Sequence, residues 1–208
     1  KGKNMTQNYG QAAAGNLPGP GLFLFLLSLI TAALTPACGG QAFSQLRSGI
    51  EARGAYIEGV PFYEQKEFDC GPSALAGVFA FWGKTVDLDR ITACIYLPQL
   101  KGTLPVDMER YAREMGFIAQ SSSGTLETLK SAVRNNLPVI CLVDLGFGIY
   151  RQPHYVTAIG FDDVHQVIIM HDGRARDSVM PFKKFDHAWA RAGRWMLVIK
   201  PKKDQDLP

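Results

Sequence analysis

Residues 60–75 read VPFYEQKEFDCGPSAL, and they give the clearest indication of how the chain folds. A short apolar start and a polar loop lead to Cys70-Gly71-Pro72, which opens an apolar run ending near Trp82-Gly83. Proline suits the first turn of a helix, where its missing N–H is not needed, and glycine suits the end of one. The pattern therefore predicts a helix that begins at Cys70.

Cys70 is a candidate nucleophile because of that position. Unpaired main-chain N–H groups and the helix dipole favour a thiolate at the start of a helix, and the thiolate is the nucleophilic form of cysteine. The neighbours Asp69 and Gly71, and the polar loop before them, favour partial exposure. The alternative is a buried, unreactive cysteine that only packs at the start of the helix.

A cysteine nucleophile needs a base, and His154 is the best candidate among the four histidines. It follows Pro153 and opens a strand-like run, and Asp172 closes the next such run. Two adjacent antiparallel strands would bring His154 and Asp172 together, so that Cys, His and Asp supply a nucleophile, a base and an orienting group. The alternatives are a strand-edge histidine without a role and an aspartate that only forms a turn. We expect His171 to lie on the surface or to serve packing.

These segments resemble a known family. Gln65, the run from Asp69 to Leu75, the run His154-Tyr155-Val156 and the later Asp172 are similar to the bacteriocin-processing, double-glycine peptidase family of papain-like cysteine peptidases. The resemblance extends over about residues 60–200. Segments at 96–98, 102–104 and 189–195 resemble the stand-alone, exported branch of that family, which is known from Gram-negative envelopes.

The resemblance implies an activity and a set of roles. It implies a cysteine peptidase of the papain-like fold, with Cys70, His154 and Asp172 as the catalytic triad and no cofactor. It also implies that Gln65, together with the Cys70 N–H, holds the oxyanion of a tetrahedral intermediate. Removing one such donor typically raises the barrier by about 3 kcal/mol. For Gln65, the alternative is a solvated loop glutamine.

The remaining sequence pattern predicts the fold class. Helix signals cover residues 85–92, 103–116 and 125–135, and strand signals cover residues 137–145, 155–161, 167–171 and 195–200. Helices thus dominate the first half and an antiparallel sheet the second. We expect an α+β, papain-like layout in which the helix that carries the nucleophile packs on the sheet that carries the base.

The N-terminal region predicts export. Residues 21–34 are apolar but shorter than the roughly 18 or more residues of a spanning helix, and small residues precede Cys38. This resembles a lipoprotein signal in which Cys38 is lipidated, although Thr35 stands where Leu is usual. Ordinary signal cleavage and an uncleaved anchor are the alternatives. We therefore expect a signal peptide (1–37), a tether (38–59), the peptidase domain (60–200) and a polar tail (201–208), anchored in the periplasm or cell envelope.

Composition excludes several other classes. The net charge of +3 does not indicate a nucleic-acid-binding protein, and four cysteines are too few for a disulfide-stabilised scaffold in a chain of this size. Cys94 and Cys141 lie in apolar runs, so we expect buried thiols, with a disulfide between them as an open alternative. The histidines have no metal-ligand spacing, so no metal site is expected. We expect the domain to be monomeric.

The substrate is expected to be a peptide or protein. The Gly-rich, aromatic loop 145–152 leads into His154, and we expect Phe147, Gly148 and Tyr150 to shape a substrate groove together with Asp69 and Gly71. Two other functions stay open. A papain-like acyltransferase would use an amine in place of water, and a non-catalytic envelope binding module would keep the fold alone.

Overall fold

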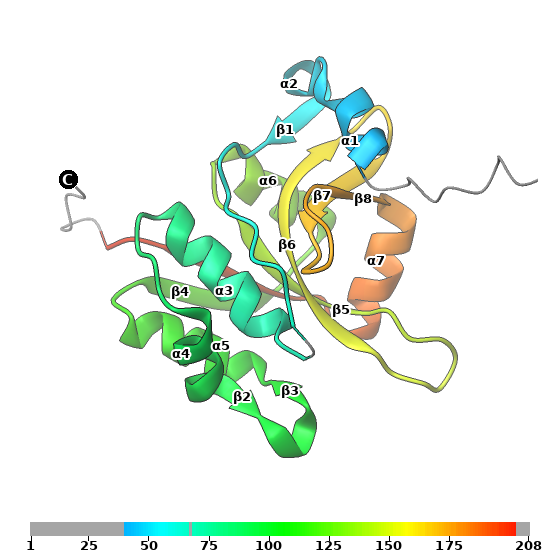
Figure 1. Ribbon diagram of the computed structural model, residues 1–208. Helices are drawn as coiled ribbons and strands as arrows, with labels where there is room; N and C mark the ends of the chain where they lie inside the picture. The colour runs from blue at the N-terminus through cyan, green and yellow to red at the C-terminus, as the bar shows by residue number, and fades with distance from the viewer. Residues whose placement is uncertain (1–39, 67, 203–208) are drawn as a thin grey trace, which may run out of the picture. The chain divides into compact units, whose positions relative to one another are not determined.

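A seven-stranded antiparallel sheet organises the protein, seen in a computed structural model that describes residues 40–66 and 68–202 (Figure 1). In spatial order its strands are β4 (Ile118–Ser123), β9 (Trp195–Lys200), β5 (Val139–Asp144), β6 (Pro153–Asp162), β7 (Val167–His171) and β8 (Ser178–Pro181), while β1 (Gly54–Tyr56) pairs with the second half of β6. Every pairing is antiparallel. The expected α+β, papain-like layout is confirmed.

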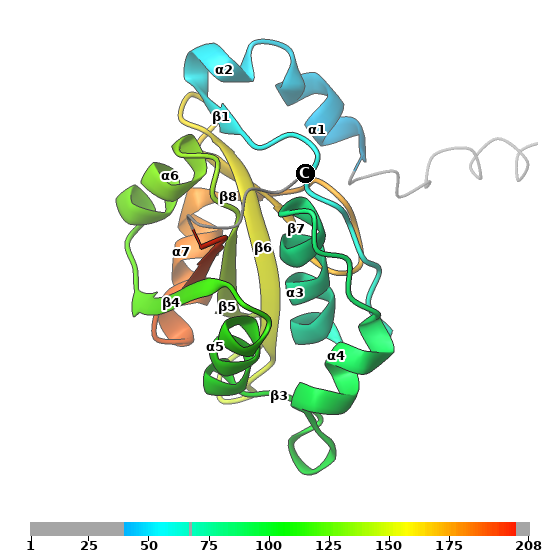
Figure 2. The same ribbon diagram turned by 90° about the vertical axis from the view of Figure 1, so that its left-hand side faces the viewer.

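Helices cover both faces of this sheet. Figure 2 shows α6 (Leu126–Arg134) and α7 (Phe182–Arg191) on one side of the strands, with α3 (Cys70–Phe81) and α4 (Leu88–Ile95) on the other. Helix α5 (Pro105–Glu114) packs with α3 and α4. Successive residues of a strand point to opposite faces. Accordingly Ile140 joins the core under α3, whereas Val139 and Cys141 join the core under α6 and α7.

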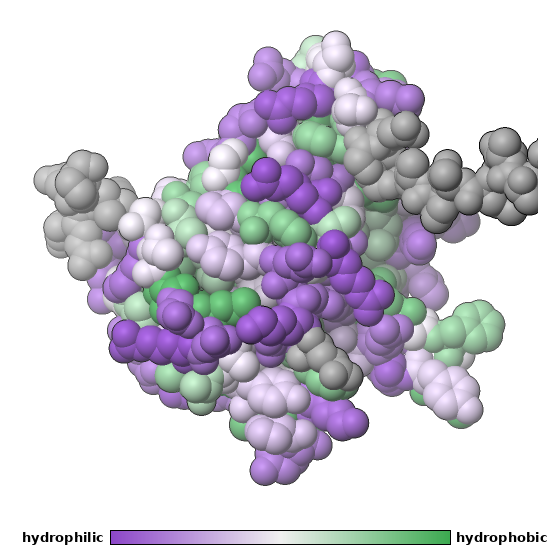
Figure 3. Space-filling model, viewed as in Figure 1, coloured by the Kyte–Doolittle hydropathy of each residue, from purple (hydrophilic) through white to green (hydrophobic). Residues whose placement is uncertain are grey.

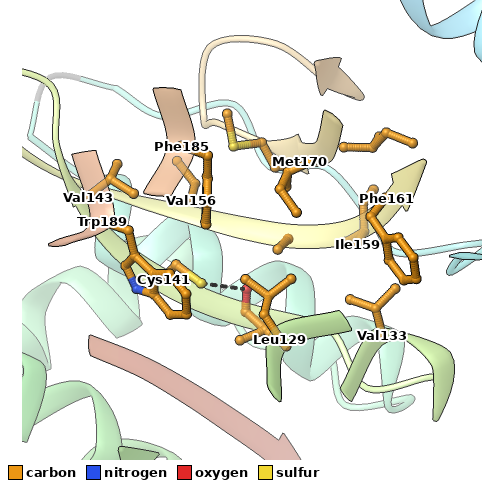
Figure 4. Packing of buried hydrophobic residues seen from close by; sticks show 14 of the residues in the cluster. Leu129, Val133, Cys141, Val143, Val156, Ile159, Phe161, Met170, Phe185 and Trp189 are labelled. Carbon is orange, nitrogen blue, oxygen red and sulfur yellow. Dashed lines mark hydrogen bonds between the residues drawn. The ribbon is translucent and has the colours of Figure 1, made fainter. Parts of the chain in front are cut away.

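The core under α6 and α7 is a close-packed apolar cluster. Figure 4 shows Leu129 of α6 and Trp189 of α7 beside Cys141 and Val156 of the strands. Helix α6 begins with a capping box, in which the Thr125 and Thr128 side chains each accept a hydrogen bond from the other's main-chain N–H. The helix thereby presents Leu129 and Val133, one turn apart, to the sheet.

The segment expected to be a tether is folded from Gly40 onward. Helices α1 (Gly40–Arg47) and α2 (Ile50–Arg53) precede β1, and Phe43 and Ile50 are buried in the core. Arg53 holds α2 to β6 through an ion pair of 3.0 Å with the buried Asp162. The prediction of a tether was wrong for these residues because short apolar spacings carry little signal in a single sequence.

Smaller elements also differ from expectation. Helix α4 begins at Leu88, three residues later than expected, because the Asp87 carboxylate caps the N–H groups of Asp89 and Arg90. The strands β2 (Tyr96–Leu97) and β3 (Gly102–Thr103) form a hairpin around the 3-10 turn η1 (Pro98–Leu100). Helix α7 was not predicted, although Phe182, Phe185 and Trp189 follow helical spacing.

The cysteines of the described region are free thiols. Cys141 is fully buried, as expected, but Cys94 is exposed on α4, so the prediction that both are buried was wrong for Cys94. The two do not form a disulfide. Burial raises the pKa of the Cys141 thiol, which makes it unreactive.

The expected signal peptide, the lipidation site Cys38 and residues 203–208 of the expected tail lie outside the described residues. All described residues belong to one compact unit, Ala37–Pro208, which contains both hydrophobic cores. Within the described ranges, no helix has the length and apolar character needed to cross a bilayer.

Packing of the α6 and α7 core makes a stability prediction. We expect Leu129→Ala to lower the free energy of unfolding by about 2–5 kcal/mol, because Leu129 is fully buried and its loss leaves a cavity. Leu100→Ala is the matched control, since Leu100 is 60% exposed on η1 and should change stability by less than about 0.5 kcal/mol. Urea denaturation measures both, and equal losses would contradict the assignment of this core.

Candidate active site

Cys70 is the first residue of α3, as the sequence predicts. Pro72 lies in the first turn, and Gly83 follows the helix with a positive φ of 76°. Residues 71–79 of the helix are buried, while Cys70 itself is half-buried. The backbone beside it is close to β3, because a Cβ on Gly71 would lie 3.0 Å from the Thr103 side chain. The β2–β3 hairpin therefore closes one side of the nucleophile.

The electrostatic environment of Cys70 differs from the expectation of a thiolate. Burial raises the pKa of the Cys70 thiol, and the negative charge of Asp69 raises it further. The main-chain N–H groups of Tyr155, Gly71 and Cys70 point at the sulfur and oppose this rise without outweighing it. Cys70 is thus a thiol in the free protein, and it needs a base when it reacts.

His154 is the second residue of β6, and its side chain is buried. Its Nε2 atom lies 2.6 Å from the main-chain oxygen of Asp172. A carbonyl oxygen can only accept, so Nε2 carries the proton and Nδ1 is left with a free lone pair. Burial lowers the pKa of His154, and the positive charge of Arg174 lowers it further, against the Asp172 carbonyl and carboxylate. The ring is therefore neutral at pH 7 and able to accept a proton.

The Cys70 sulfur lies beside the strand that carries His154. Its donor Tyr155 N–H belongs to the residue after His154, and α3 packs directly on β6 (Figure 2). Within the described residues, no hydrogen bond joins Cys70 to His154. Catalytic hydrogen bonds are often long in unliganded structures and shorten when the substrate binds.

Asp172 has two roles, and only one matches the expected triad. Its carbonyl orients His154, whereas its carboxylate faces the turn between β7 and β8. Oδ1 accepts the N–H groups of Arg174 and Ala175, at 2.9 and 2.7 Å, and Oδ2 accepts the Ser178 hydroxyl at 2.7 Å. The turn-forming alternative thus describes the carboxylate, and the imidazole is held by the main chain.

Gln65 is fixed beside the same turn. Its N–H donates to the Gly173 carbonyl at 2.8 Å, and a Cβ on Gly173 would lie 2.4 Å from the Gln65 Oε1 atom. Gly173 also has a positive φ of 77°, a conformation that favours glycine. Oε1 is buried without a partner. The segment before Cys70 and the turn after β7 are thereby joined.

A small cavity beside Cys70 brings several of these elements together. It is lined by Val60, Pro61, Phe62, Tyr63, Cys70, Ser73, Ala74, Gly77, Tyr155, Thr157, His171 and Gly173. Of the expected groove residues, Asp69 and Gly71 are the chain neighbours of Cys70, but neither lines the cavity. Phe147, Gly148 and Tyr150 are absent from the lining, and Phe147 and Tyr150 are exposed. The structure does not bring these three to the Cys70 cavity.

His171 is a site residue whose importance the sequence did not indicate. It is buried, and its Nε2 lies 3.0 Å from the Val60 carbonyl, while its Nδ1 accepts the Asp177 N–H at 3.2 Å. These partners define a neutral ring that ties the start of the 60–69 segment to the β7–β8 turn. Burial is the main cause that lowers the pKa of His171. The expectation of a surface position was wrong, and that of packing was right.

Thr103 and Tyr155 were also missed as site residues. The Tyr155 hydroxyl donates to the Thr103 carbonyl at 3.0 Å, which fixes the β2–β3 hairpin over Gly71. No periodicity in a single sequence predicts such a long-range contact. In residues 40–66 and 68–202, no group of His, Cys, Asp and Glu is arranged to hold a metal ion.

Comparison with known proteins places this geometry in context. A family model described as the Peptidase_C39 like family matches residues 57–196. No protein among the curated sequences matches the chain.

Solved structures are similar in fold. The peptidase domain of Streptococcus ComA, a bifunctional ABC transporter of a quorum-sensing pathway, is 20% identical, with a TM-score of 0.54 over 68% of this chain and 97% of its own. A double glycine motif protease from an AMS/PCAT transporter, solved in complex with the leader peptide, is 23% identical, with a TM-score of 0.58 over 72% and 96%. At these identities the likeness concerns the fold alone.

Asp69 gives the first prediction for the site. We expect Asp69→Asn to shift the alkylation of Cys70 to lower pH, because it removes a negative charge that raises the Cys70 pKa. The shift should be partial, since burial remains. Iodoacetamide labelling located by mass spectrometry, across pH 5–10, measures it. Glu64→Gln, an exposed acid in the same loop, is the control, and an unchanged profile for Asp69→Asn would refute the effect.

The buried histidines predict how stability depends on pH. Burial lowers the pKa of His154 and His171 in the folded protein. As the pH falls below about 6.5, these histidines therefore become protonated in the unfolded chain before they do in the folded protein. The free energy of unfolding should therefore fall as the pH drops through and below 6.5. Each unit by which the pKa is lowered adds about 1.4 kcal/mol to this loss.

The variant His171→Gln isolates one of these groups. It should be less stable at pH 8, because Gln cannot reproduce both ring hydrogen bonds, and it should lose less stability between pH 8 and pH 5 than the unmodified protein. Urea denaturation at the two values measures this. His187→Gln, an exposed histidine on α7, should leave the pH dependence unchanged. An equal pH dependence in all three proteins would contradict the role of His171.

Proposed function

The chain belongs to the Peptidase_C39 like family, and from this premise we propose that it is a cysteine peptidase in which His154 activates Cys70. One observation supports the proposal most directly. The hydrogen bond from His154 Nε2 to the Asp172 carbonyl leaves Nδ1 unprotonated on a neutral ring. A base in this state can take the proton from a thiol that burial keeps protonated.

The reaction follows from these protonation states. When a peptide carbonyl reaches Cys70, Nδ1 of His154 takes the thiol proton and the sulfur attacks the carbonyl carbon. The Cys70 N–H and the Gln65 side-chain amide hold the oxyanion of the tetrahedral intermediate. Nδ1–H then protonates the leaving amine, the C–N bond breaks, and a thioester remains.

Hydrolysis of the thioester completes the cycle. A water molecule gives its proton to Nδ1 and attacks the carbonyl carbon, and the restored thiol leaves with that proton. The negative charge of Asp172 supports the imidazolium that forms in each half-reaction, although its carbonyl makes the hydrogen bond. The same groups therefore serve both steps.

For the substrate and location, the proposal rests on sequence and on a neighbour. The transporter protease of similar fold was solved with a leader peptide. We propose that this chain also takes a peptide or protein substrate, and that the substrate contacts Asp69 and Gly71 beside Cys70. Residues 21–34 and Cys38 support export and lipid attachment in the cell envelope. We propose a monomeric enzyme.

Asp172 distinguishes this mechanism from a triad that acts through the carboxylate. Peptide-library cleavage followed by mass spectrometry should show products with the unmodified protein and none with Cys70→Ala. We expect Asp172→Asn to retain most of the activity, with kcat/KM reduced less than about tenfold. The amide oxygen can still accept the Arg174 and Ala175 N–H groups, and the carbonyl that orients His154 is unchanged.

Asp172→Ala is the matched comparison. It removes every side-chain acceptor of the turn, so we expect kcat/KM to fall by about 100-fold, in the range of lost acid–base catalysis. If Asp172→Asn instead falls as far as Asp172→Ala, the carboxylate itself is the orienting group. Absence of any Cys70-dependent product would favour a binding module, and amide products formed only with added amines would indicate an acyltransferase.

A further inference from the structure

The connection between β5 and β6, residues 145–152, bears the three most exposed large apolar side chains of the described residues. Phe147 and Ile149 are each 89% exposed, and Tyr150 is 78% exposed. Figure 1 shows this connection projecting beyond the ends of the two strands, and Figure 3 shows its side chains standing clear of the surrounding surface. The three side chains do not belong to the Cys70 cavity.

A buried carboxylate organises the base of this loop. Asp144, the last residue of β5, accepts the N–H groups of Gly146 and Gln152 on Oδ1, each at 2.9 Å. Its Oδ2 accepts Arg151 at 2.7 Å and the Arg191 Nε at 3.2 Å. Burial opposes the charge on Asp144, but these donors outweigh it and lower the pKa below its usual range. The carboxylate is thus ionised and joins both ends of the loop.

The rest of the loop is closed by its own main chain. The Tyr150 N–H donates to the Phe147 carbonyl at 3.0 Å, and the Leu145 N–H donates to the Gln152 carbonyl at 2.9 Å. Arg191 reaches the Gly148 and Tyr150 carbonyls at 3.4 and 3.5 Å. A Cβ on Gly146 would lie 1.9 Å from the Tyr150 oxygen, so the two sides of the loop touch. These hydrogen bonds hold the loop in one conformation, with the three apolar side chains pointing into solvent.

The size of the apolar tip argues against a protein partner. The aromatic side chains of Phe147 and Tyr150 bury about 150–250 Å² each, so together with Ile149 the tip offers roughly 500 Å². A stable protein interface needs about 800 Å² from each partner. Insertion into a lipid interface has no such threshold, because affinity there scales with the apolar area inserted.

The chemistry of the loop also fits the boundary between lipid and water. Tyrosine is enriched at that boundary, where its ring is apolar and its hydroxyl is wet. Residues 145–152 contain no acid. At the base of the loop, Arg151 and Arg191 share the single carboxylate of Asp144, so one positive charge remains to favour anionic headgroups. The hydrogen bonds within the loop also matter, because unpaired main-chain groups are costly in lipid.

We propose that the β5–β6 loop is a membrane-docking element that inserts Phe147, Ile149 and Tyr150 into the interfacial layer of an anionic bilayer. This goes beyond the proposed peptidase activity and does not depend on it, since it rests on the exposure and the hydrogen bonds of the loop alone. It is also separate from any attachment through Cys38. The loop leads directly into His154, so docking would fix the orientation of the active site relative to the bilayer.

Vesicle flotation tests the proposal with the compact unit Ala37–Pro208, which lacks the apolar residues 21–34. We expect it to float with vesicles of phosphatidylethanolamine and phosphatidylglycerol. A loop variant that combines Phe147→Ser, Ile149→Ser and Tyr150→Ser should bind at least about tenfold more weakly, since binding scales with apolar area. The control variant combines Leu100→Ser, Val106→Ser and Val164→Ser, which are 60–67% exposed elsewhere, and it should bind like the unmodified unit.

A second measurement detects insertion without the triple variant. Tyr150→Trp should be quenched by brominated lipids more strongly than the unmodified protein, whose three tryptophans lie outside the loop. Failure of the unmodified unit to float, equal binding by the loop variant, or no added quenching would each overturn the proposal. Two further results would overturn it. One is that light scattering shows a dimer for the unmodified unit and a monomer for the loop variant, with no change in vesicle binding. The other is that the loop variant loses only peptide turnover, measured without vesicles.

Discussion

The antiparallel pairing of β6 with β7 is the constraint on which the site depends. The pairing sets Thr157 opposite His171, so His154 at the start of one strand meets Asp172 just after the other. The residues beside Asp172 then hold the segment before the nucleophile, because Gly173 accepts the Gln65 N–H and His171 contacts the Val60 carbonyl. The same β6 strand directs the Tyr155 N–H at the Cys70 sulfur. One strand pair thus assembles base, nucleophile and loop.

Two opposing effects decide the state of the nucleophile. The start of α3 and three main-chain N–H groups favour a thiolate, whereas burial and Asp69 favour the thiol. Burial prevails, and the same effect keeps His154 neutral. In the proposed mechanism, a pair that is neutral at rest exchanges its proton when a substrate carbonyl arrives, so that charge separation develops during the attack and not before it.

The sequence predicted those features that local chemistry determines. Pro72 and Gly83 marked the ends of α3, and the strand signal at residues 137–145 marked β5. It also indicated Cys70, His154, Asp172 and Gln65 as site residues, and the structure joins Gln65, His154 and the Asp172–Gly173 turn. The sequence could not predict which atoms of these residues form the hydrogen bonds. Whether Asp172 orients His154 through its carbonyl or its carboxylate depends on competing donors at Arg174, Ala175 and Ser178, which only the folded turn brings together.

The pairing of the first described segment with β6 has a consequence for the order of events during folding. Arg53 and Asp162 form an ion pair across 109 positions of the chain, and β1 pairs with β6 at the neighbouring residues. Contacts between such distant residues form slowly, because the chain between them must first be ordered. The N-terminal segment therefore cannot complete its place in the sheet until nearly the whole domain has been synthesised.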